Sequence, residues 1–397
     1  MSRRGATGLA GIVAIDKPAG MTSHDVVNRV RRITGERRVG HAGTLDPLAT
    51  GLLVVGVGPA TRLSPYLTDH DKTYEARIVF GVPTDTDDAD GRVMEPPSAD
   101  ELAERIERVC GLDAESVCAD LVGTVDQLPP AYSAIKKGGV TAYRAARAGE
   151  ALELETRRVT VHASEFLGAA TVTERLAVRG SGGDAGAPGA AVDEAVCGES
   201  VGGEAVCNES VGNEAAGNEA VSGEAVSNEA VSNEDAYDES AGAAGAPGAY
   251  DDPGRLEVEL PCWDVRLSVS KGTYIRSIAR DLGAVLGCGA HVGALRRVAV
   301  GGFDVSRAVT LDGLAGIVGA GGEIPWCDPA ELLGFPIVEL TPQMERDVAC
   351  GRRLAAAGCG DARVSCVAGR RLMAVYEGAA GGLRPVTVIP GGVAGVA

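Results

Sequence analysis

The stretch at residues 40–53, GHAGTLDPLATGLL, sets the firmest limit on how this chain folds. Pro47 fixes its own φ, lacks a backbone donor and favours extended geometry at Asp46, so no regular helix runs through this point. The glycines on either side let the backbone bend and allow another molecule to approach closely. An Asp-Pro step between glycines is also typical of an ordinary turn, and its composition alone does not decide between a turn and a site.

The neighbours of Asp46 favour a functional site. His41 lies five positions upstream, and the apolar run LLVVGV at residues 52–57 predicts a buried strand just downstream. A polar loop fixed to a buried strand is a usual place for binding and catalytic residues. Asp46 is therefore our candidate for a catalytic carboxylate.

Six further blocks of sequence follow one another over the first three hundred residues. They are GIVAIDKPAGMTSHD (11–25), DKTYEA (71–76), TDTDDADG (84–91), QLPPAYSAIK (127–136), SKGTYIRSI (270–278) and GCGAHVGALRRVAV (287–300). With the loop around Asp46, these blocks resemble the TruB family of bacterial tRNA pseudouridine-55 synthases, which convert a uridine in the TΨC loop of tRNA to pseudouridine. Six ordered blocks are far more specific than any single motif.

The resemblance implies a fold and a set of catalytic residues. The expected fold is the α+β pseudouridine synthase fold, with a mixed, mainly antiparallel central sheet flanked by helices. The resemblance places the catalytic aspartate at Asp46 and the arginine that pairs with it at Arg276. Tyr74 matches the tyrosine that stacks on the target base and is a candidate base for the C5 proton. Tyr274 is a second aromatic residue of the pocket, and Leu295 matches a residue that lines it.

The other expected site residues contact the substrate RNA. His41 corresponds to the family histidine that enters the loop where the uridine leaves its stack. Arg37 and Arg38 belong to a run of five arginines between residues 29 and 38. Such a run is often only a solvated helix face, but here it lies beside the proposed site, which favours phosphate contact. Lys17, in the first block, completes the expected substrate-binding set.

The chemistry of the reaction explains these residue types. Pseudouridine formation breaks an N-glycosidic bond, turns the freed uracil and rejoins it through C5. It needs a nucleophile or anionic stabiliser and a base for the C5 proton, but no redox agent, metal or cofactor. A carboxylate kept ionised by a guanidinium meets the first need. Three points stay open: whether Asp46 attacks the sugar or the ring, whether Arg276 forms only a structural ion pair, and whether each tyrosine is a core residue.

Charge is distributed unevenly along the chain. The sequence has 37 Lys and Arg against 55 Asp and Glu, a net charge of −18, which at first sight argues against a nucleic-acid partner. Residues 181–254 hold 16 of the acidic residues and no Lys or Arg, which leaves 37 basic against 39 acidic residues elsewhere. A near-neutral body can present a basic face to tRNA.

The pattern along the chain predicts three parts. Residues 1–310 form the catalytic domain, and residues 181–254 form an insertion within it. Between residues 193 and 242 of this insertion a glutamate recurs at every fifth position. A five-residue period leaves no apolar helix face, so we expect this insertion to be a disordered acidic loop. Residues 311–335 have a weak pattern and are predicted as a linker. Residues 336–397 resemble a reduced, PUA-like C-terminal domain that is rich in strands.

Several kinds of site and location are not expected. The acidic block at residues 84–91 has alternating carboxylates but lacks the terminal glutamate of an EF-hand loop, so we expect no metal. The ten cysteines include no C-x-x-C pair, which argues against zinc and, without a signal peptide, against disulfides. No apolar run is long enough to span a bilayer. We expect a cytoplasmic, monomeric enzyme that acts on the tRNA T-arm without an obligate protein partner.

Two other functions are compatible with the same blocks. In one, the chain acts chiefly as an RNA-binding or tRNA-folding module and catalysis is secondary. In the other, it is the guide-RNA-dependent relative of this family, which works with partner proteins. Rescue of a strain lacking the enzyme by the Asp46→Asn protein would favour the first. Failure of the purified chain to act on a bare T-arm hairpin would favour the second.

Replacement of residues 181–254 by a short turn is expected to leave turnover nearly unchanged, because the family pattern has only a short turn at this place. The measurement is kcat and KM on a tRNA transcript for the shortened and the full chain. A large loss of turnover would show that the acidic segment has a role in catalysis or in tRNA binding.

Overall fold

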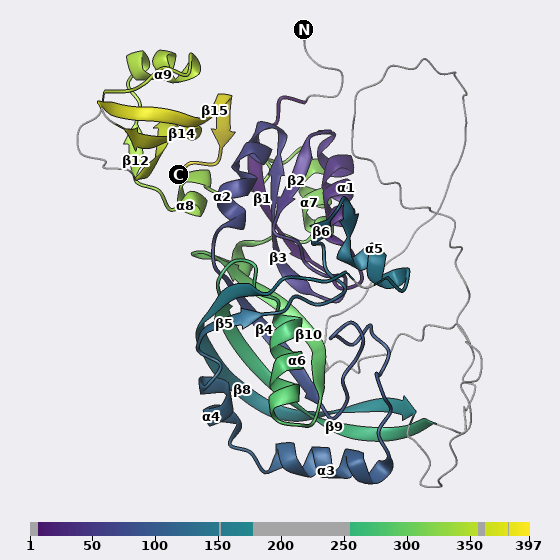
Figure 1. Ribbon diagram of the computed structural model, residues 1–397. Helices are drawn as coiled ribbons and strands as arrows, with labels where there is room; N and C mark the ends of the chain where they lie inside the picture. Colours follow the sequence, from purple (N-terminus) through teal and green to yellow (C-terminus); the bar gives the residue numbers. More distant parts are fainter. Residues whose placement is uncertain (1–6, 151, 178–254, 356–361, 380) are drawn as a thin grey trace, which may run out of the picture. The chain divides into compact units, whose positions relative to one another are not determined.

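The computed structural model describes residues 7–150, 152–177, 255–355, 362–379 and 381–397 (Figure 1). The expected disordered insertion at residues 181–254 lies outside the described residues and stays a prediction. The described residues form a nine-stranded sheet, a four-stranded sheet and a two-stranded ribbon, with helices packed against the larger sheets.

The nine-stranded sheet is mixed and mainly antiparallel, as predicted. Its strands are β1 (Gly11–Lys17), β2 (Val39–Ala42), β3 (Thr50–Val57), β4 (Lys72–Phe80), β5 (Gly123–Gln127), β8 (Arg157–Ala177), β9 (Arg255–Val269), β10 (Ala290–Val300) and β11 (Phe303–Asp304). Their order is β1-β3-β10-β4-β9-β8-β5, with β2 paired to β3 and β11 to β10. β3 and β10 run parallel, whereas β1 joins β3, and β4 joins both β10 and β9, in antiparallel pairs.

The helices of this part of the chain follow local signals in the sequence. They are α1 (Ser23–Thr34), η1 (Gly58–Leu63), α2 (Ser64–Thr68), α3 (Ala99–Cys110), α4 (Ala114–Ala119), α5 (Ala142–Arg147), α6 (Ile275–Val285), η2 (Val305–Arg307) and α7 (Leu311–Gly319), and the ribbon is β6 (Lys136–Lys137) with β7 (Val140–Thr141). In α1, the Thr22 side chain accepts from the Asp25 backbone N–H and so caps the first turn. Gly35 ends the helix in the left-handed conformation.

Helix α6 brings the distant block at residues 270–278 onto the sheet. It packs on β10 and β4, as Figure 1 shows. Its Ile275, Ile278 and Ala279 are buried in one core cluster with Tyr74 of β4 and Leu295 of β10. Burial of this apolar face is the main force that holds the helix on the sheet, because burial of apolar surface dominates folding.

Gly51 permits the close parallel contact between β3 and β10. Its φ is +97°, and a Cβ atom there would lie 2.3 Å from the carbonyl oxygen of Arg297, its partner in the register. Only glycine adopts such a φ without strain and also leaves room for the neighbouring backbone. β10 is therefore seated directly beside the strand that follows the Asp46 loop.

The segment expected to be a linker, residues 311–335, contains regular structure. It includes α7, which packs on α1, and α8 (Pro329–Leu333). The backbone N–H of Cys327 donates to the carbonyl oxygen of Ile12 in β1 at 2.8 Å. The segment is thus a packed part of the structure. Its contacts with β1 and α1 are distant in the sequence, so the local hydrophobic pattern did not predict them.

The C-terminal part is rich in strands, as predicted. Its sheet has the order β12-β13-β14-β15, formed by β12 (Ile337–Glu339), β13 (Arg363–Ala368), β14 (Arg371–Ala379) and β15 (Gly382–Ala394), and α9 (Pro342–Ala349) contacts β14 and β15. The domain boundaries, like the PUA-like nature of residues 336–397, stay predictions. None of the helices among the described residues has the length and apolar character needed to cross a bilayer.

The substitution Gly51→Ala is expected to lower the free energy of unfolding by roughly 2–4 kcal/mol, because the added Cβ meets a backbone carbonyl and the left-handed φ is strained. Urea unfolding measures the change. The matched control is Gly316→Ala in α7, where no atom lies within 4 Å of the new Cβ and φ is ordinary. Equal stability of the two variants would contradict the role given to Gly51.

Candidate active site

Asp46 lies in the loop that joins β2 to β3, and the loop is held by hydrogen bonds on both sides of the carboxylate. The Ser23 hydroxyl accepts from the Leu45 backbone N–H at 2.8 Å and donates to the Leu45 carbonyl oxygen at 3.0 Å. The Gly20 N–H donates to the carbonyl oxygen of Pro47 at 2.9 Å. The residues that flank Asp46 are therefore fixed, while its own side chain stays 35% exposed.

Two buried cations reinforce the same loop. The Lys17 amine donates to the carbonyl oxygens of Met21 at 2.6 Å and of Pro47 at 3.2 Å. The Arg297 guanidinium donates to the carbonyl oxygen of Gly43 at 3.1 Å. Burial lowers the pKa of Lys17 to about 8, and the nearby Asp46 carboxylate works against that shift. Lys17 was expected to contact substrate, but its enclosed amine favours support of the loop instead.

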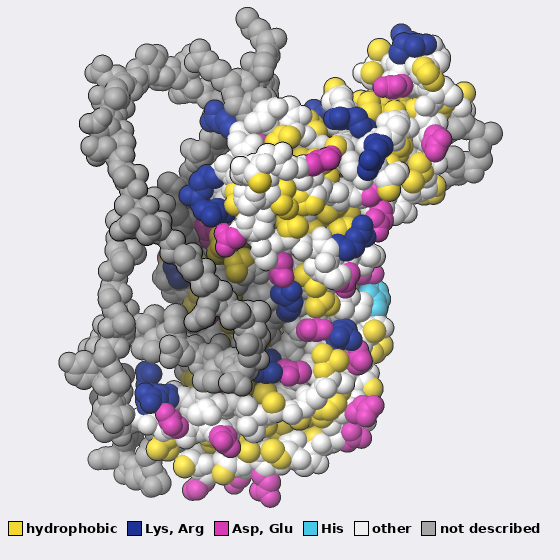
Figure 2. Space-filling view, turned by 180° about the vertical axis from the view of Figure 1, so that it is seen from behind, with side chains coloured by type: hydrophobic (Ala, Val, Ile, Leu, Met, Phe, Trp, Pro, Cys, Tyr) yellow, Lys and Arg dark blue, Asp and Glu magenta, His cyan; other side chains and the backbone are white. Residues whose placement is uncertain are grey.

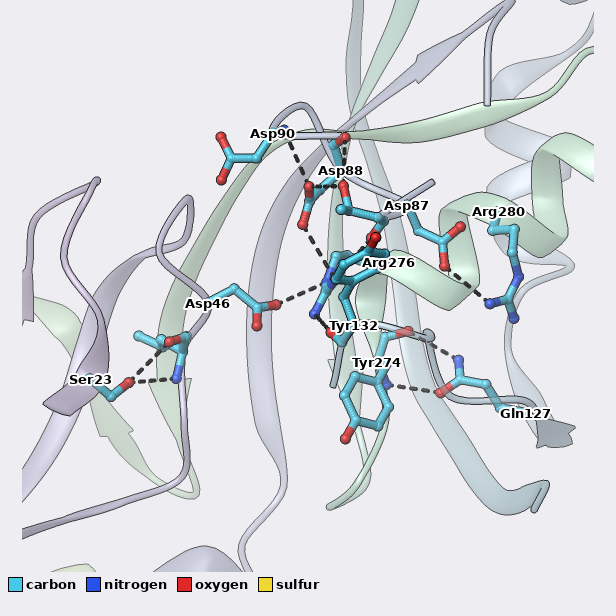
Figure 3. A network of polar contacts seen from close by, with 12 residues as sticks. Ser23, Asp46, Asp87, Asp88, Asp90, Gln127, Tyr132, Tyr274, Arg276 and Arg280 are labelled. Atoms are coloured by element: carbon cyan, nitrogen blue, oxygen red, sulfur yellow. Dashed lines mark hydrogen bonds and ion pairs between the residues drawn. The ribbon is translucent and has the colours of Figure 1, made fainter. Parts of the chain in front are cut away.

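Arg276, near the start of α6, contacts Asp46 (Figure 3). Its Nε atom lies 3.0 Å from Asp46 Oδ2. The Nε–H is not aligned as a hydrogen bond, so this contact is an ion pair. The rest of the guanidinium, only 5% exposed, donates to the carbonyl oxygens of Thr86 and Tyr132, each at 2.9 Å. The two residues paired by the resemblance are thus in contact, although 230 positions separate them in the sequence.

The acidic block at residues 84–91 faces the arginines of α6. Asp88 Oδ2 lies 3.4 Å from Arg276 Nη1, and Asp87 Oδ2 lies 3.1 Å from Arg280 Nη1. Burial raises the pKa of both carboxyl groups, and the arginines work against the rise. From the sequence, these carboxylates were considered only as metal ligands, and no metal was expected there. The missed signal was the spacing of Arg276 and Arg280, which places two cations on one helix face.

Tyr274 is fixed by its backbone at the first turn of α6. The Gln127 side chain accepts from the Tyr274 N–H at 2.9 Å and donates to the Tyr274 carbonyl oxygen at 3.0 Å. Burial raises the pKa of the Tyr274 phenol. Tyr74 and Leu295, each 8% exposed, lie in the core cluster that also contains Leu45, the residue before Asp46. Tyr74 and Leu295 therefore share a core with the Asp46 loop through Leu45, and Gln127 is an additional residue that positions Tyr274.

Of the expected RNA contacts, His41 lies on β2 next to the Asp46 loop, whereas Arg37 and Arg38 precede β2 and lie at the other end of the β2–β3 pair. His41 has a buried Nδ1 atom without a hydrogen-bond partner among the described residues, and burial lowers the pKa of its ring. Arg37 and Arg38 are exposed, and Arg38 Nε donates to the hydroxyl of Thr61 at 2.7 Å. Figure 2 shows basic and acidic side chains interspersed on one face of the molecule. The roles of the site residues in RNA binding and catalysis stay predictions.

Comparisons with known proteins identify the family. A model described as TruB family pseudouridylate synthase (N terminal domain) matches residues 31–184, and one for the tRNA pseudouridylate synthase B C-terminal domain matches residues 276–320. A tRNA pseudouridine synthase B from Thermobifida fusca is 38% identical over 96% of this chain and 99% of its own length. This chain belongs to the TruB family. A relative of the same name from Azoarcus is 34% identical over 96% of the chain and 94% of its own length.

Solved structures agree with the TruB fold. A chain in a Cbf5-Nop10-Gar1 complex is similar with a TM-score of 0.53 and 20% identity, over 96% of this chain and 84% of that one. A likeness at this identity shows the fold alone. The predicted family and fold class are confirmed. The C-terminal TruB model falls on residues 276–320, which include α6 and α7, rather than on the strand-rich residues 336–397.

A pH-dependent stability is expected from Lys17. Folding lowers its pKa from 10.5 to about 8, so between these values the folded chain binds fewer protons than the unfolded chain. The free energy of unfolding therefore gains a term that rises with pH across this window and is lost as pH falls through 8. Lys17→Met removes that term. Lys72 is also buried, but it is present in both proteins, so its contribution cancels in the comparison.

Urea unfolding of the wild type and of Lys17→Met between pH 8 and 10.5 measures the effect, with those two values taken from the Lys17 shift. The stability of the wild type relative to the variant should increase with pH. A difference that is independent of pH would contradict the assigned burial of the charged amine.

Proposed function

We propose that this tRNA pseudouridine synthase isomerises the uridine at position 55, in the T-arm, with Asp46 as the nucleophile. Its family and its enzyme class, an isomerase, rest on the relatives named tRNA pseudouridine synthase B. The observation that carries the residue assignment is the 3.0 Å contact between a partly exposed carboxylate, Asp46, and a buried guanidinium, Arg276. The carboxylate is the nucleophilic form of an aspartate, and Arg276 places a positive charge beside it.

The guanidinium is in place before substrate arrives. Arg276 is held by the carbonyl oxygens of Thr86 and Tyr132 and by the carboxylate of Asp88. A charge fixed in this way need not reorganise during the reaction, which is the basis of electrostatic preorganisation. Asp46 therefore meets the sugar or the ring of the substrate from one defined position.

The tyrosines suit an everted nucleoside. An enzyme that acts on a base within a folded RNA must take that base out of its stack. Stacking on an aromatic side chain contributes roughly 1–3 kcal/mol, which offsets much of that cost. Tyr74 borders the Asp46 loop through the shared core, and Tyr274 is fixed at the start of α6. We assign Tyr74 to stacking and to removal of the C5 proton, and Tyr274 to the pocket wall.

We propose tRNA as the substrate of a cytoplasmic monomer that needs no obligate protein partner. The relatives named tRNA pseudouridine synthase B support the substrate. A single chain supplies Asp46, Arg276 and Tyr274, which supports action without a partner. The cytoplasmic assignment follows from the substrate.

Activity on a bare T-arm hairpin separates this function from a guide-RNA-dependent one. The fold is shared with chains in complexes named for the box H/ACA sRNP, but likeness at 19% identity does not carry their assembly to this chain. The purified protein should release the C5 proton of the target uridine without an added guide RNA or protein. Dependence on such additions would contradict the proposal.

The substitution Asp46→Asn is expected to reduce turnover by at least about 1,000-fold, because an amide is not a nucleophile, while tRNA affinity is retained. Release of tritium from C5-labelled uridine in a tRNA transcript measures turnover, and filter binding measures affinity. The matched control is Asp264→Asn, which loses an ion pair to Arg77 on the β4–β9 pair and should keep wild-type turnover. Robust tritium release by the Asp46→Asn protein would refute the assignment.

A further inference from the structure

Ser133 has a buried hydroxyl that no group in the described residues satisfies. Its residue is 4% exposed, and its Oγ atom has no hydrogen-bond partner. Most buried polar groups in folded proteins are paired, so an unpaired one needs an explanation. Among the described residues the few similar atoms include Nδ1 of His41 and Nε of Arg276, both at the site already described.

The backbone around Ser133 ties it to the active site. The carbonyl oxygen of Tyr132, the preceding residue, accepts from Arg276 Nη2 at 2.9 Å. The carbonyl oxygen of Ser133 itself accepts from the Tyr143 N–H at 3.0 Å. Burial raises the pKa of the Tyr274 phenol, and the nearby Ser133 hydroxyl works against that rise. The two hydroxyl groups are close but are not aligned as a hydrogen bond.

The site has few donors left for a uracil carbonyl. Arg276 directs its nitrogens at the carbonyl oxygens of Thr86 and Tyr132 and at the carboxylates of Asp46 and Asp88. Each of the three guanidinium nitrogens therefore already has a neighbouring protein oxygen among the described residues. A uracil ring has two carbonyl oxygens, and each loses its water when the base enters a closed pocket. The Ser133 hydroxyl is a donor that the protein leaves free.

We propose that Ser133 is a further substrate-contacting residue, whose hydroxyl donates a hydrogen bond to a carbonyl oxygen of the everted uracil. This inference rests on the proposed function, because it names a contact for the same substrate. A serine hydroxyl can rotate to direct its proton at a new acceptor. The contact holds the ring relative to Asp46 while the ring is turned.

The first test is Ser133→Ala. The value of kcat/KM for a T-arm hairpin should fall about tenfold, the range expected for one lost neutral hydrogen bond in a closed site. The melting temperature of the free protein should not fall, because the hydroxyl has no partner there. The matched control is Ser365→Ala in β13, which removes a fully buried hydroxyl that also lacks a partner and should leave kcat/KM unchanged.

The second test uses hairpins with 2-thiouridine or 4-thiouridine at the target position, because sulfur is a weak acceptor. The wild type should lose rate on the analogue whose sulfur replaces the contacted oxygen. The Ser133→Ala variant should show no additional loss on that same analogue. This non-additivity is the signature of a direct contact, and a residue that only supports the fold would not produce it.

Three results would overturn the inference while the wild type remains active on the hairpin. They are unchanged kcat/KM in Ser133→Ala, additive losses with both analogues, and a large fall in the melting temperature of the free variant. The proposed function fails in a different way, because the wild type would then be inactive on the uridine hairpin. The two failures are therefore distinguishable.

Discussion

The ion pair between Asp46 and Arg276 is the interaction around which the rest of the structure is arranged. Asp46 lies in the loop between β2 and β3, and Arg276 lies in the first turn of α6, between β9 and β10. A contact of 3.0 Å between such distant segments requires every element between them to be placed accurately. The sheet order, the burial of α6 and the close pairing of β10 with β3 together bring Asp46 and Arg276 into contact.

Buried charged and polar groups support the ion pair. Each of them would be energetically unfavourable without a partner. Buried cations donate to the carbonyl oxygens of the Asp46 loop, and buried carboxylates form ion pairs with the arginines of α6. Each such group is stable only when its partners stay in place, since an unpaired buried charge is strongly unfavourable. The charged groups around the ion pair therefore hold one another in place.

The sequence was sufficient for the elements with local signals and for the main chemical pair. Thr22 and Gly35 mark the ends of α1, and the Asp-Pro step marks the loop, because capping and turn formation depend on near neighbours. The sequence alone was not sufficient to predict contacts between residues that are distant in the chain. Lys17 was expected to contact substrate but its amine is enclosed, and the pairing of the Asp87 and Asp88 carboxylates with arginines was not predicted. Residues 311–335 were predicted as a linker because the residues they pack against are far away in the sequence.

The ordering of the sheet has a consequence for how the protein can be divided. β8 ends at Ala177 and β9 begins at Arg255, and the two are neighbours in the sheet. A cut in the backbone between them would give one fragment that carries the carboxylate and another that carries the guanidinium, held together by strand pairing, a shared core and ion pairs. Complementation of the two fragments would make catalysis itself a reporter of their assembly, and new chain termini at this point would give a circular permutant with an intact centre.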